Sequence, residues 1–311
     1  SGSGGSDSIS SGDGHDILQY SSGLELSIDT QVDGGSGTDT LQFTSAGVTD
    51  VDDGDFVKVT NIEVVDFGNG NNVATFGTNA ASAAGNLSIS GGSGNNTFDV
   101  SNLGEAATIM VGGGIDTIIG GTGSDSITSG SGNDSISGGA ANDTLVFGVN
   151  LTSSDTIDGG AGTGDILTFT DGNSASDDLN RVTNVETITL GDADTNVTSV
   201  DALVASGATL TVDGSGLTGT KKLTWDGSAE TNGRFNITGG AGADSITSGS
   251  GNDSISGGAD NDTLVFGVNL TSSDTVDGGS GTGDILTFTD GNSASDDLNR
   301  VTNVETITLG N

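Results

Sequence analysis

Residues 120–146 read GGTGSDSIT, SGSGNDSIS and GGAANDTLV, three consecutive blocks of nine residues that share one pattern. Each block opens on a glycine-rich stretch, carries aspartate at position six and places Ile or Leu at position eight. One more block in the same frame comes before them, a second array occupies residues 239–265, and a remnant lies at 2–19. A strict period of this kind predicts stacked, equivalent turns.

Composition limits what the chain can be. It has 311 residues, no Cys and no Pro, and 43 acidic residues against six Lys and Arg, for a formal charge of −37. That balance argues against nucleic acid and anionic membranes as partners, because both need basic surfaces. The absence of Cys excludes disulfides and thiolate metal sites, and no apolar run is long enough to span a bilayer. Low hydrophobicity with high net charge is typical of disorder, but the in-phase repeats favour a folded chain.

A longer period organises the whole chain. Residues 120–191 recur at 239–310, an offset of 119 residues, with five differences over 72 positions. A diverged copy at the start is marked by the motif V-T-N-(I/V)-E, which stands at residues 59–63, 182–186 and 301–305. These repeats predict the C-terminal part of a first module (1–68), a second module (69–191, with its array at 111–146) and a third (192–311, with its array at 239–265). Boundaries inside the repeat suggest a piece of a longer tandem array.

Glycine and aspartate at these spacings are suited to calcium. Glycine allows positive φ, so that backbone carbonyls can point inward, and Ca²⁺ takes about six to eight oxygen ligands from carbonyls and carboxylates. One turn cannot supply that many, so turns stacked 18 residues apart in a flattened roll are expected to share the ions. The predicted row partners are Asp116 with Asp134, Asp125 with Asp143, and Asp244 with Asp262. Asp253 would face a degenerate turn at 230–238, where Phe235 replaces the aspartate.

The predicted calcium ligands are the aspartates at position six. In the arrays and the remnant they are Asp7, Asp16, Asp116, Asp125, Asp134, Asp143, Asp244, Asp253 and Asp262. Three more lie in isolated turns with no evident partner, namely Asp39, Asp165 and Asp284. The alternative is that all are ordinary turn formers, but seven in phase with Gly and Ile or Leu favour calcium. The pattern decays where Val111, Ser129 and Ser248 replace the first glycine, and calcium occupancy is expected to decline at the edges of each array.

The residues at position eight are expected to point inward as an aliphatic ladder. They are Ile118, Ile127, Ile136, Leu145, Ile246, Ile255 and Leu264. Their neighbours are mostly Ser or Thr, which suit a solvent-facing strand surface. Short helices are expected at 79–84 and within 199–206.

The blocks resemble the nonapeptide G-G-x-G-x-D-x-U-x of the RTX family, in which U is a large aliphatic residue. The resemblance implies an all-β fold, a parallel β-roll or β-solenoid with stacked calcium-binding turns and a few short helices. It also implies a secreted, extracellular protein of the bacterial cell surface that folds where calcium is abundant.

Two functions stay open. The first is a calcium-dependent structural repeat protein that builds a surface layer, filament or adhesin stalk from copies of itself, joined end to end or laterally. The second is a calcium-triggered folding and export region of a larger secreted enzyme or toxin. Near-identical modules favour the first, since solenoid stacking extends without limit. The complete modules contain no His and therefore no Ser-His-Asp set, so no enzyme is expected; cell-surface polysaccharide is a further candidate partner.

Overall fold

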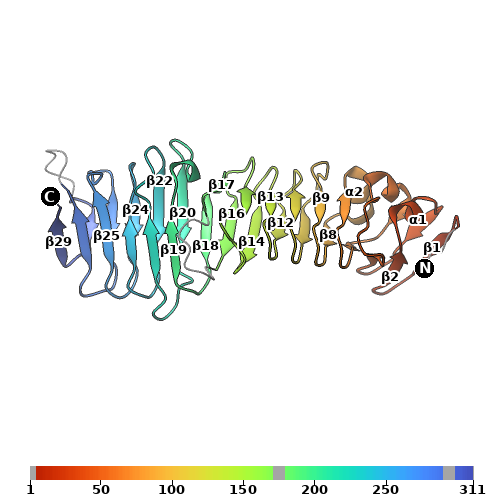
Figure 1. Cartoon of the computed structure of the whole chain (residues 1–311), viewed down its shortest axis with the longest axis horizontal. Coiled ribbons are helices and arrows are strands. Elements are labelled where there is room, and N and C mark those ends of the chain that lie inside the picture. Colours follow the sequence, from red (N-terminus) through yellow and green to blue (C-terminus); the bar gives the residue numbers. More distant parts are fainter. Residues whose placement is uncertain (1–4, 171–178, 290–297, 311) are drawn as a thin grey trace. The chain divides into compact units, whose positions relative to one another are not determined.

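The computed structural model describes residues 5–170, 179–289 and 298–310, and its regular secondary structure consists mainly of short parallel strands (Figure 1). Two compact units are distinguished: an N-terminal unit of residues 1–146 with 156–165, and a C-terminal unit of residues 147–155 with 166–311. The division falls inside the second sequence module. Each unit is a parallel β-solenoid, as expected from the sequence.

The N-terminal unit alternates its strands between walls, so that a strand pairs with the next but one in the chain. One wall consists of β2 (Ile17–Tyr20), β4 (Thr40–Phe43), β6 (Val64–Asp66), β8 (Leu87–Ser90), β10 (Ala107–Met110), β12 (Ser126–Thr128) and β14 (Thr144–Gly148). The others are β1 (Ser8–Ser10), β3 (Gln31–Asp33) and β5 (Val59–Thr60) in one sheet, and β7 (Val73–Thr75), β9 (Thr97–Asp99), β11 (Thr117–Ile119), β13 (Ser135–Ser137) and β15 (Thr156–Asp158) in another.

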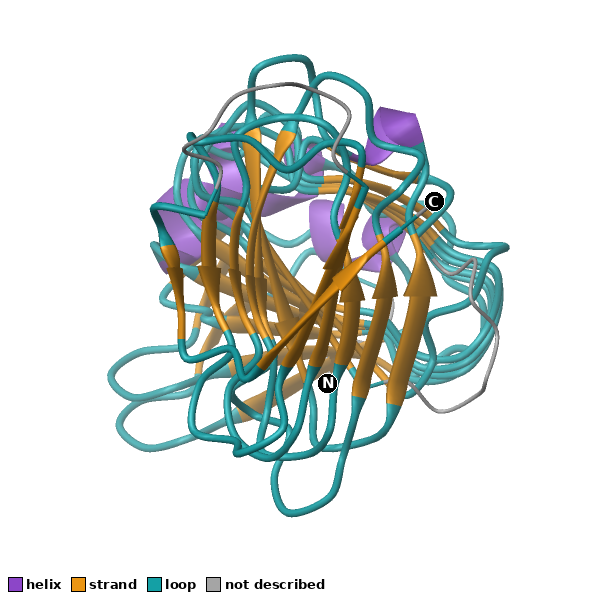
Figure 2. Cartoon of the chain, turned by 90° about the vertical axis from the view of Figure 1, so that its left-hand side faces the viewer, coloured by secondary structure: helices purple, strands orange, loops and turns teal. Residues whose placement is uncertain are grey.

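The C-terminal unit follows the same alternation, with strands in the walls and turns at the corners of each coil (Figure 2). One wall consists of β16 (Ile166–Phe169), β18 (Thr187–Leu190), β20 (Thr209–Asp213), β22 (Arg234–Thr238), β24 (Ser254–Ser256), β26 (Thr275–Asp277) and β28 (Val301–Thr302). The second wall consists of β19 (Thr195–Thr198), β21 (Leu223–Asp226), β23 (Ser245–Thr247), β25 (Thr263–Gly267), β27 (Ile285–Phe288) and β29 (Thr306–Leu309). β17 (Val182–Thr183) precedes β18.

The position-eight residues form the core of the arrays. Parallel pairing places Ile118 beside Ile136 and Ile127 beside Leu145, each at most 2% exposed. Ile246, Ile255 and Leu264 are equally buried in the C-terminal unit. Burying one such side chain stabilises a fold by roughly 1.5–3 kcal/mol, and the in-line register repeats that gain at every coil. The predicted aliphatic ladder is confirmed.

Among the described residues, helices occur only in the irregular coils. They are α1 (Gly23–Ser27), α2 (Thr78–Ala84) and the 3-10 helices η1 (Asp53–Lys58) and η2 (Asp201–Leu203). The helix predicted at 79–84 is therefore confirmed, with the backbone N–H groups at its start bound to the Asp53 carboxylate. The helix predicted within 199–206 was wrong in type and length, because the β-branched Val200 and Val204 on either side of η2 stay extended. Within the described ranges, no helix has the length and apolar character needed to cross a membrane.

Candidate metal centre

The position-six aspartates stack in rows at the corners, directly before the strands. The backbone N–H of Asp125 donates to Oδ1 of Asp143 at 2.7 Å, and that of Asp116 donates to Oδ1 of Asp134 at 2.9 Å. In the C-terminal unit the N–H of Asp244 donates to Oδ1 of Asp262 at 2.7 Å. The predicted pairing of turns 18 residues apart is confirmed in both arrays.

The degenerate turn also lies where it was expected. The N–H of Phe235 donates to Oδ1 of Asp253 at 2.7 Å, so Asp253 faces a turn that has no position-six carboxylate. The carboxylate of Glu230 is buried in that turn instead, with 1% of the residue exposed. Its Oε1 accepts from the N–H groups of Asn232 and Gly233, while its Oε2 accepts no hydrogen bond.

The array aspartates are almost completely buried, and none is more than 2% exposed. Charged side chains are rarely buried so deeply unless a partner neutralises them. The second carboxylate oxygen, Oδ2, is buried and accepts no hydrogen bond in several of the predicted ligands, namely Asp16, Asp39, Asp116, Asp143, Asp262 and Asp284. A buried oxygen of this kind is destabilising by about 1–3 kcal/mol or more when it bears charge. These oxygens are therefore suited to a cation.

Backbone carbonyls face the same spaces as the carboxylates. A Cβ on Gly239 would overlap both the carbonyl oxygen of Gly257 in the next turn and Oδ2 of Asp244. A Cβ on Gly120 would overlap Gly138 O and lie 3.0 Å from Oδ2 of Asp125. Only glycine leaves this space open, so the glycine-rich half of each block creates a cradle of oxygen atoms between two turns. No group of three or more His, Cys or acidic side chains lies together in the described part of the chain, so carbonyls must complete any coordination shell.

Burial and neighbouring charges make these carboxyl groups hard to ionise without a cation. Desolvation raises the pKa of Asp143 to about 7, and the charges of Asp125 and Asp165 add to the effect. Desolvation raises the pKa of Asp262 to about 7 in the same way, helped by Asp244 and Asp284. A divalent cation between the rows would remove the repulsion and supply the missing neutralisation.

The serines that replace the first glycine have a clear effect. Ser129 Oγ donates to Oδ2 of Asp134, and Ser248 Oγ donates to Oδ2 of Asp253. In these turns a hydroxyl thus engages the oxygen that is left unpaired in Asp116 and Asp143. The sequence identified Ser129 and Ser248 as departures from the pattern, and the structure shows which carboxylate oxygen each hydroxyl binds.

Three aspartates predicted to lack a partner have one, so that prediction was wrong. The N–H of Asp143 donates to Oδ1 of Asp165, that of Asp262 to Asp284 and that of Asp16 to Asp39, over 2.7–2.8 Å. The coils here hold 22 or 23 residues. The extra residues are absorbed between the strands, and the aspartates stay in line. The remaining candidate, Asp7, is exposed and its N–H donates to Oδ1 of Asp29.

Several row members escaped the sequence reasoning because their turns lack the glycine pattern. Oδ1 of Asp274 accepts the N–H of Asp253 at 2.7 Å. Its only sequence signal is that Asp274, Thr275 and Val276 follow the order Asp-x-aliphatic found in the nonapeptides. Asp29, Glu63, Glu230 and Glu305 were missed for the same reason. Asn72 and Asn96 were missed because asparagine stands where the pattern has aspartate. The role of the whole set as metal ligands stays a prediction.

Two asparagines continue one row in a form that needs no ion. Asn72 and Asn96 are fully buried, and Nδ2 of Asn72 donates to Oδ1 of Asn96 at 2.8 Å. Nδ2 of Asn96 donates to the carbonyl of Gly94 and to Oδ1 of Asp116, both at 2.9 Å. The amide group thus links a glycine carbonyl to the next carboxylate, a link that a cation would make in an aspartate turn. We refer to Asn72 and Asn96 as the asparagine ladder.

The asparagine ladder leads to a prediction for its neighbour. Replacing Asp116 by Asn is expected to add one more amide link and to remove a carboxyl whose pKa is raised by burial. The variant should bind fewer calcium ions yet fold at the same or a lower calcium concentration than the parent chain. Asp116→Ala, which leaves the row interrupted, should raise the calcium midpoint of folding several-fold. Circular dichroism during calcium titration measures both, and equal impairment by Asn and Ala would contradict the prediction.

The sequence was compared with known proteins. The model of the RTX calcium-binding nonapeptide repeat matches in four copies, at residues 1–23, 110–145 and 236–267. The chain carries RTX repeats. No curated protein and no solved structure matches the chain. RTX repeats are calcium-binding motifs, so the hard cation that fits the oxygen cradles of the RTX arrays is Ca²⁺. The matched residues leave out the asparagine ladder and the V-T-N-(I/V)-E motifs.

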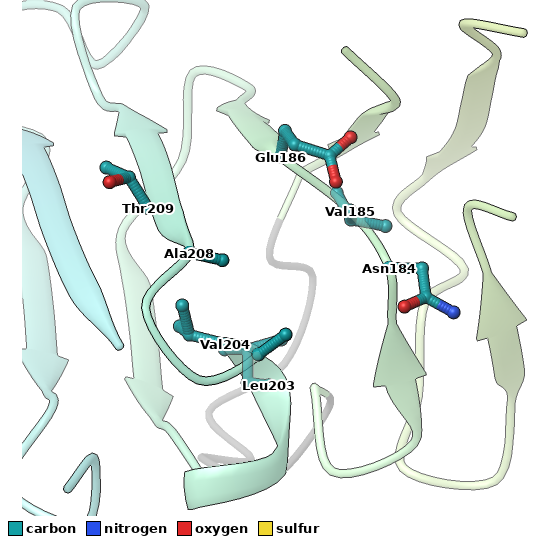
Figure 3. A pocket seen from close by; sticks show the side chains of 8 residues that line it. Asn184, Val185, Glu186, Leu203, Val204, Ala208 and Thr209 are labelled. Carbon is teal, nitrogen blue, oxygen red and sulfur yellow. The ribbon is translucent and has the colours of Figure 1, made fainter. Parts of the chain in front are cut away.

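A cavity of about 50 Å³ lies in the C-terminal unit (Figure 3), away from the RTX arrays. Asn184, Val185 and Glu186 form one side of it, and Leu203, Val204, Ala205, Ala208 and Thr209 form the rest. The volume suits a few water molecules, whereas pockets for small ligands measure roughly 300–1,000 Å³. This cavity is therefore not a candidate ligand site.

Proposed function

We propose that the chain is a secreted, calcium-dependent structural repeat protein that assembles with copies of itself into a layer, filament or stalk on a bacterial cell surface. Calcium binding by the RTX rows allows the coils to fold, and the folded modules stack. Millimolar calcium outside the cell matches the affinity range of extracellular calcium modules, about 10⁻⁴–10⁻³ M. RTX repeat proteins are typically secreted, which supports the compartment.

The observation that carries the proposal is the way in which one module stacks on the next of its own kind. Residues 120–191 recur at 239–310 with five differences over 72 positions. The last strand of the second module, β18, pairs in parallel with β20 of the third. Ile188 and Leu190 in β18 are at most 2% exposed. Near-identical modules therefore continue one solenoid, with a buried core across the junction.

A junction of this kind favours assembly by coil stacking. A solenoid repeat buries its core only through its neighbours, and a parallel strand edge is a template for a further strand. Copies of the module are therefore expected to stack as the second and third modules do.

Electron microscopy with and without EGTA tests assembly. Filaments or lattices are expected in millimolar calcium and should dissolve on chelation. Monodisperse monomers of the parent chain at high concentration in calcium would overturn the proposal and favour the export region of a larger secreted enzyme or toxin.

A further inference from the structure

A short turn outside the RTX repeats recurs in the three modules. It has the sequence T-N-x-E and stands at residues 60–63, 183–186 and 302–305. Its asparagine adopts a left-handed backbone in each case, with φ of 54° at Asn61, 53° at Asn184 and 52° at Asn303. Left-handed conformations are costly for residues other than glycine, and asparagine tolerates them best. An unfavourable conformation kept at three equivalent positions indicates a role for the carbonyl and carboxylate that it orients.

In the N-terminal unit this turn closes the row that contains Asp39. The N–H of Asp39 donates to Oε2 of Glu63 at 2.8 Å, so the glutamate takes the position in the row that an aspartate takes elsewhere. A Cβ on Gly34 would overlap the carbonyl oxygen of Asn61 and lie 2.8 Å from Oδ2 of Asp39. Asp39 is fully buried, and its Oδ2 accepts no hydrogen bond.

The C-terminal unit repeats the arrangement. The N–H of Asp284 donates to Oε2 of Glu305 at 2.9 Å. A Cβ on Gly278 would overlap the carbonyl oxygen of Asn303 and lie 2.8 Å from Cβ of Asp284. Asp284 is fully buried, and its Oδ2 likewise accepts no hydrogen bond. Glu305 is exposed.

The T-N-x-E turn forms the same kind of oxygen cradle as an RTX turn, but fewer residues separate its carbonyl from its carboxylate. In the array, the carbonyl of Gly138 and the carboxylate of Asp125 face Gly120. In the T-N-x-E turn a left-handed asparagine supplies the carbonyl, and glutamate, one methylene longer than aspartate, reaches the row from two residues further on. At the occurrence in residues 183–186, Asn184 and Glu186 are among the residues that line the small cavity of Figure 3.

We propose that the T-N-x-E turn supplies the closing ligands of an additional calcium site beyond the RTX repeats. In the N-terminal unit the ligands are the carboxylates of Asp39 and Glu63 and the carbonyl of Asn61. In the C-terminal unit they are the carboxylates of Asp284 and Glu305 and the carbonyl of Asn303. The proposal rests on the calcium-dependent function proposed above and extends it to coils that the family model does not match.

These sites bind calcium more weakly than the RTX rows. Each offers two carboxylates and a carbonyl, so water must complete the coordination shell of about six to eight oxygens. Glu63 is half-buried and Glu305 is exposed, and a flexible, hydrated ligand lowers calcium affinity. The closing sites therefore fill last in a titration, after the rows have ordered the coils.

Counting bound ions tests the proposal. The double variant Glu63→Gln with Glu305→Gln keeps an oxygen that accepts the N–H of each aspartate but removes both charges. The matched control is Glu105→Gln, an exposed glutamate outside the rows that changes the charge in the same direction. Native mass spectrometry and equilibrium dialysis over roughly 0.01–10 mM calcium, which brackets the affinities of extracellular calcium modules, should show two fewer ions in the double variant than in the control. The ions lost should be those of the weakest binding step.

The outcomes separate this proposal from the proposed function. If the parent chain folds with calcium and the double variant binds as many ions as the control at every concentration, the closing sites do not exist. If the parent chain binds no calcium, the proposed function falls with them. Should the double variant fail to fold, Glu305→Gln alone, at an exposed position, must lose one ion for the proposal to stand.

Discussion

Chelating calcium with EGTA at pH 8 is expected to unfold the chain. Most of its β-sheet circular dichroism should disappear, and the radius of gyration should rise toward the roughly 60 Å of an unfolded chain of this length. The reason lies in the rows, where buried carboxylates such as Asp116 and Asp143 keep an oxygen without a partner. The formal charge of −37 adds repulsion over the whole chain.

The free energies involved indicate that unfolding in EGTA is cooperative. Leaving one buried charge without its partner costs about 3–5 kcal/mol, while a whole domain is stable by about 5–15 kcal/mol. A few unneutralised aspartates are therefore enough to unfold a unit. Small-angle scattering and circular dichroism measure the change, and readdition of calcium should reverse it, whereas Mg²⁺, which prefers a tighter octahedral shell, should not. Identical scattering curves in calcium and in EGTA would rule out calcium-coupled folding.

Protons are expected to replace calcium. In EGTA, lowering the pH from 8 to 5 should restore compact β structure, while staying above the sequence pI of about 4.1. In the metal-free fold the pKa of Asp143 and of Asp262 is raised to about 7 by burial, against an ordinary value of 3.8. The folded chain then holds protons that the unfolded chain has released. This stabilisation is complete below about pH 4 and is lost as the pH rises through 7.

A matched variant sharpens the acid test. Asp143→Asn combined with Asp262→Asn removes two of the groups that must be protonated, so the variant should keep β structure in EGTA to a higher pH than the parent chain. Glu105→Gln, in an exposed position, should leave the transition unchanged. Circular dichroism across the pH range in EGTA measures the midpoint. If the parent chain in EGTA is equally unfolded at pH 5 and at pH 8, ionised carboxylates in the rows are not what destabilises the metal-free fold.

The arrays could be predicted in detail because their period is strict. With nine residues per turn, an offset of 18 fixes both the partner of each aspartate and the side of the strand that Ile127 or Ile255 faces. The prediction failed where the coil length changes. Asp165 lies 22 residues after Asp143, and no sequence rule says that the extra residues loop out while the aspartates stay aligned.

The row members that were missed show what a motif leaves out. Asn96 lies in a glycine-rich block with asparagine at position six, and a rule that requires aspartate passes over it. Glu63 has a different side-chain length and no glycine before it, so only the three-dimensional row reveals its equivalence to an aspartate. Ser129 was visible as a departure from the pattern, but its hydrogen bond to Asp134 depends on geometry that spacing does not encode.

The asparagine ladder also bears on the order of events in folding. Parallel sheets are usually slow to form, because their contacts lie far apart in sequence. Here Thr97 pairs with Thr117, only 20 residues away, and the following coil repeats the step at 18. Each coil therefore closes a small loop on the coil before it, and the contacts stay local along the chain. Because the amides of the asparagine ladder complete their hydrogen bonds without an ion, we expect these turns to form before calcium binds and to act as a template on which the neighbouring coils fold.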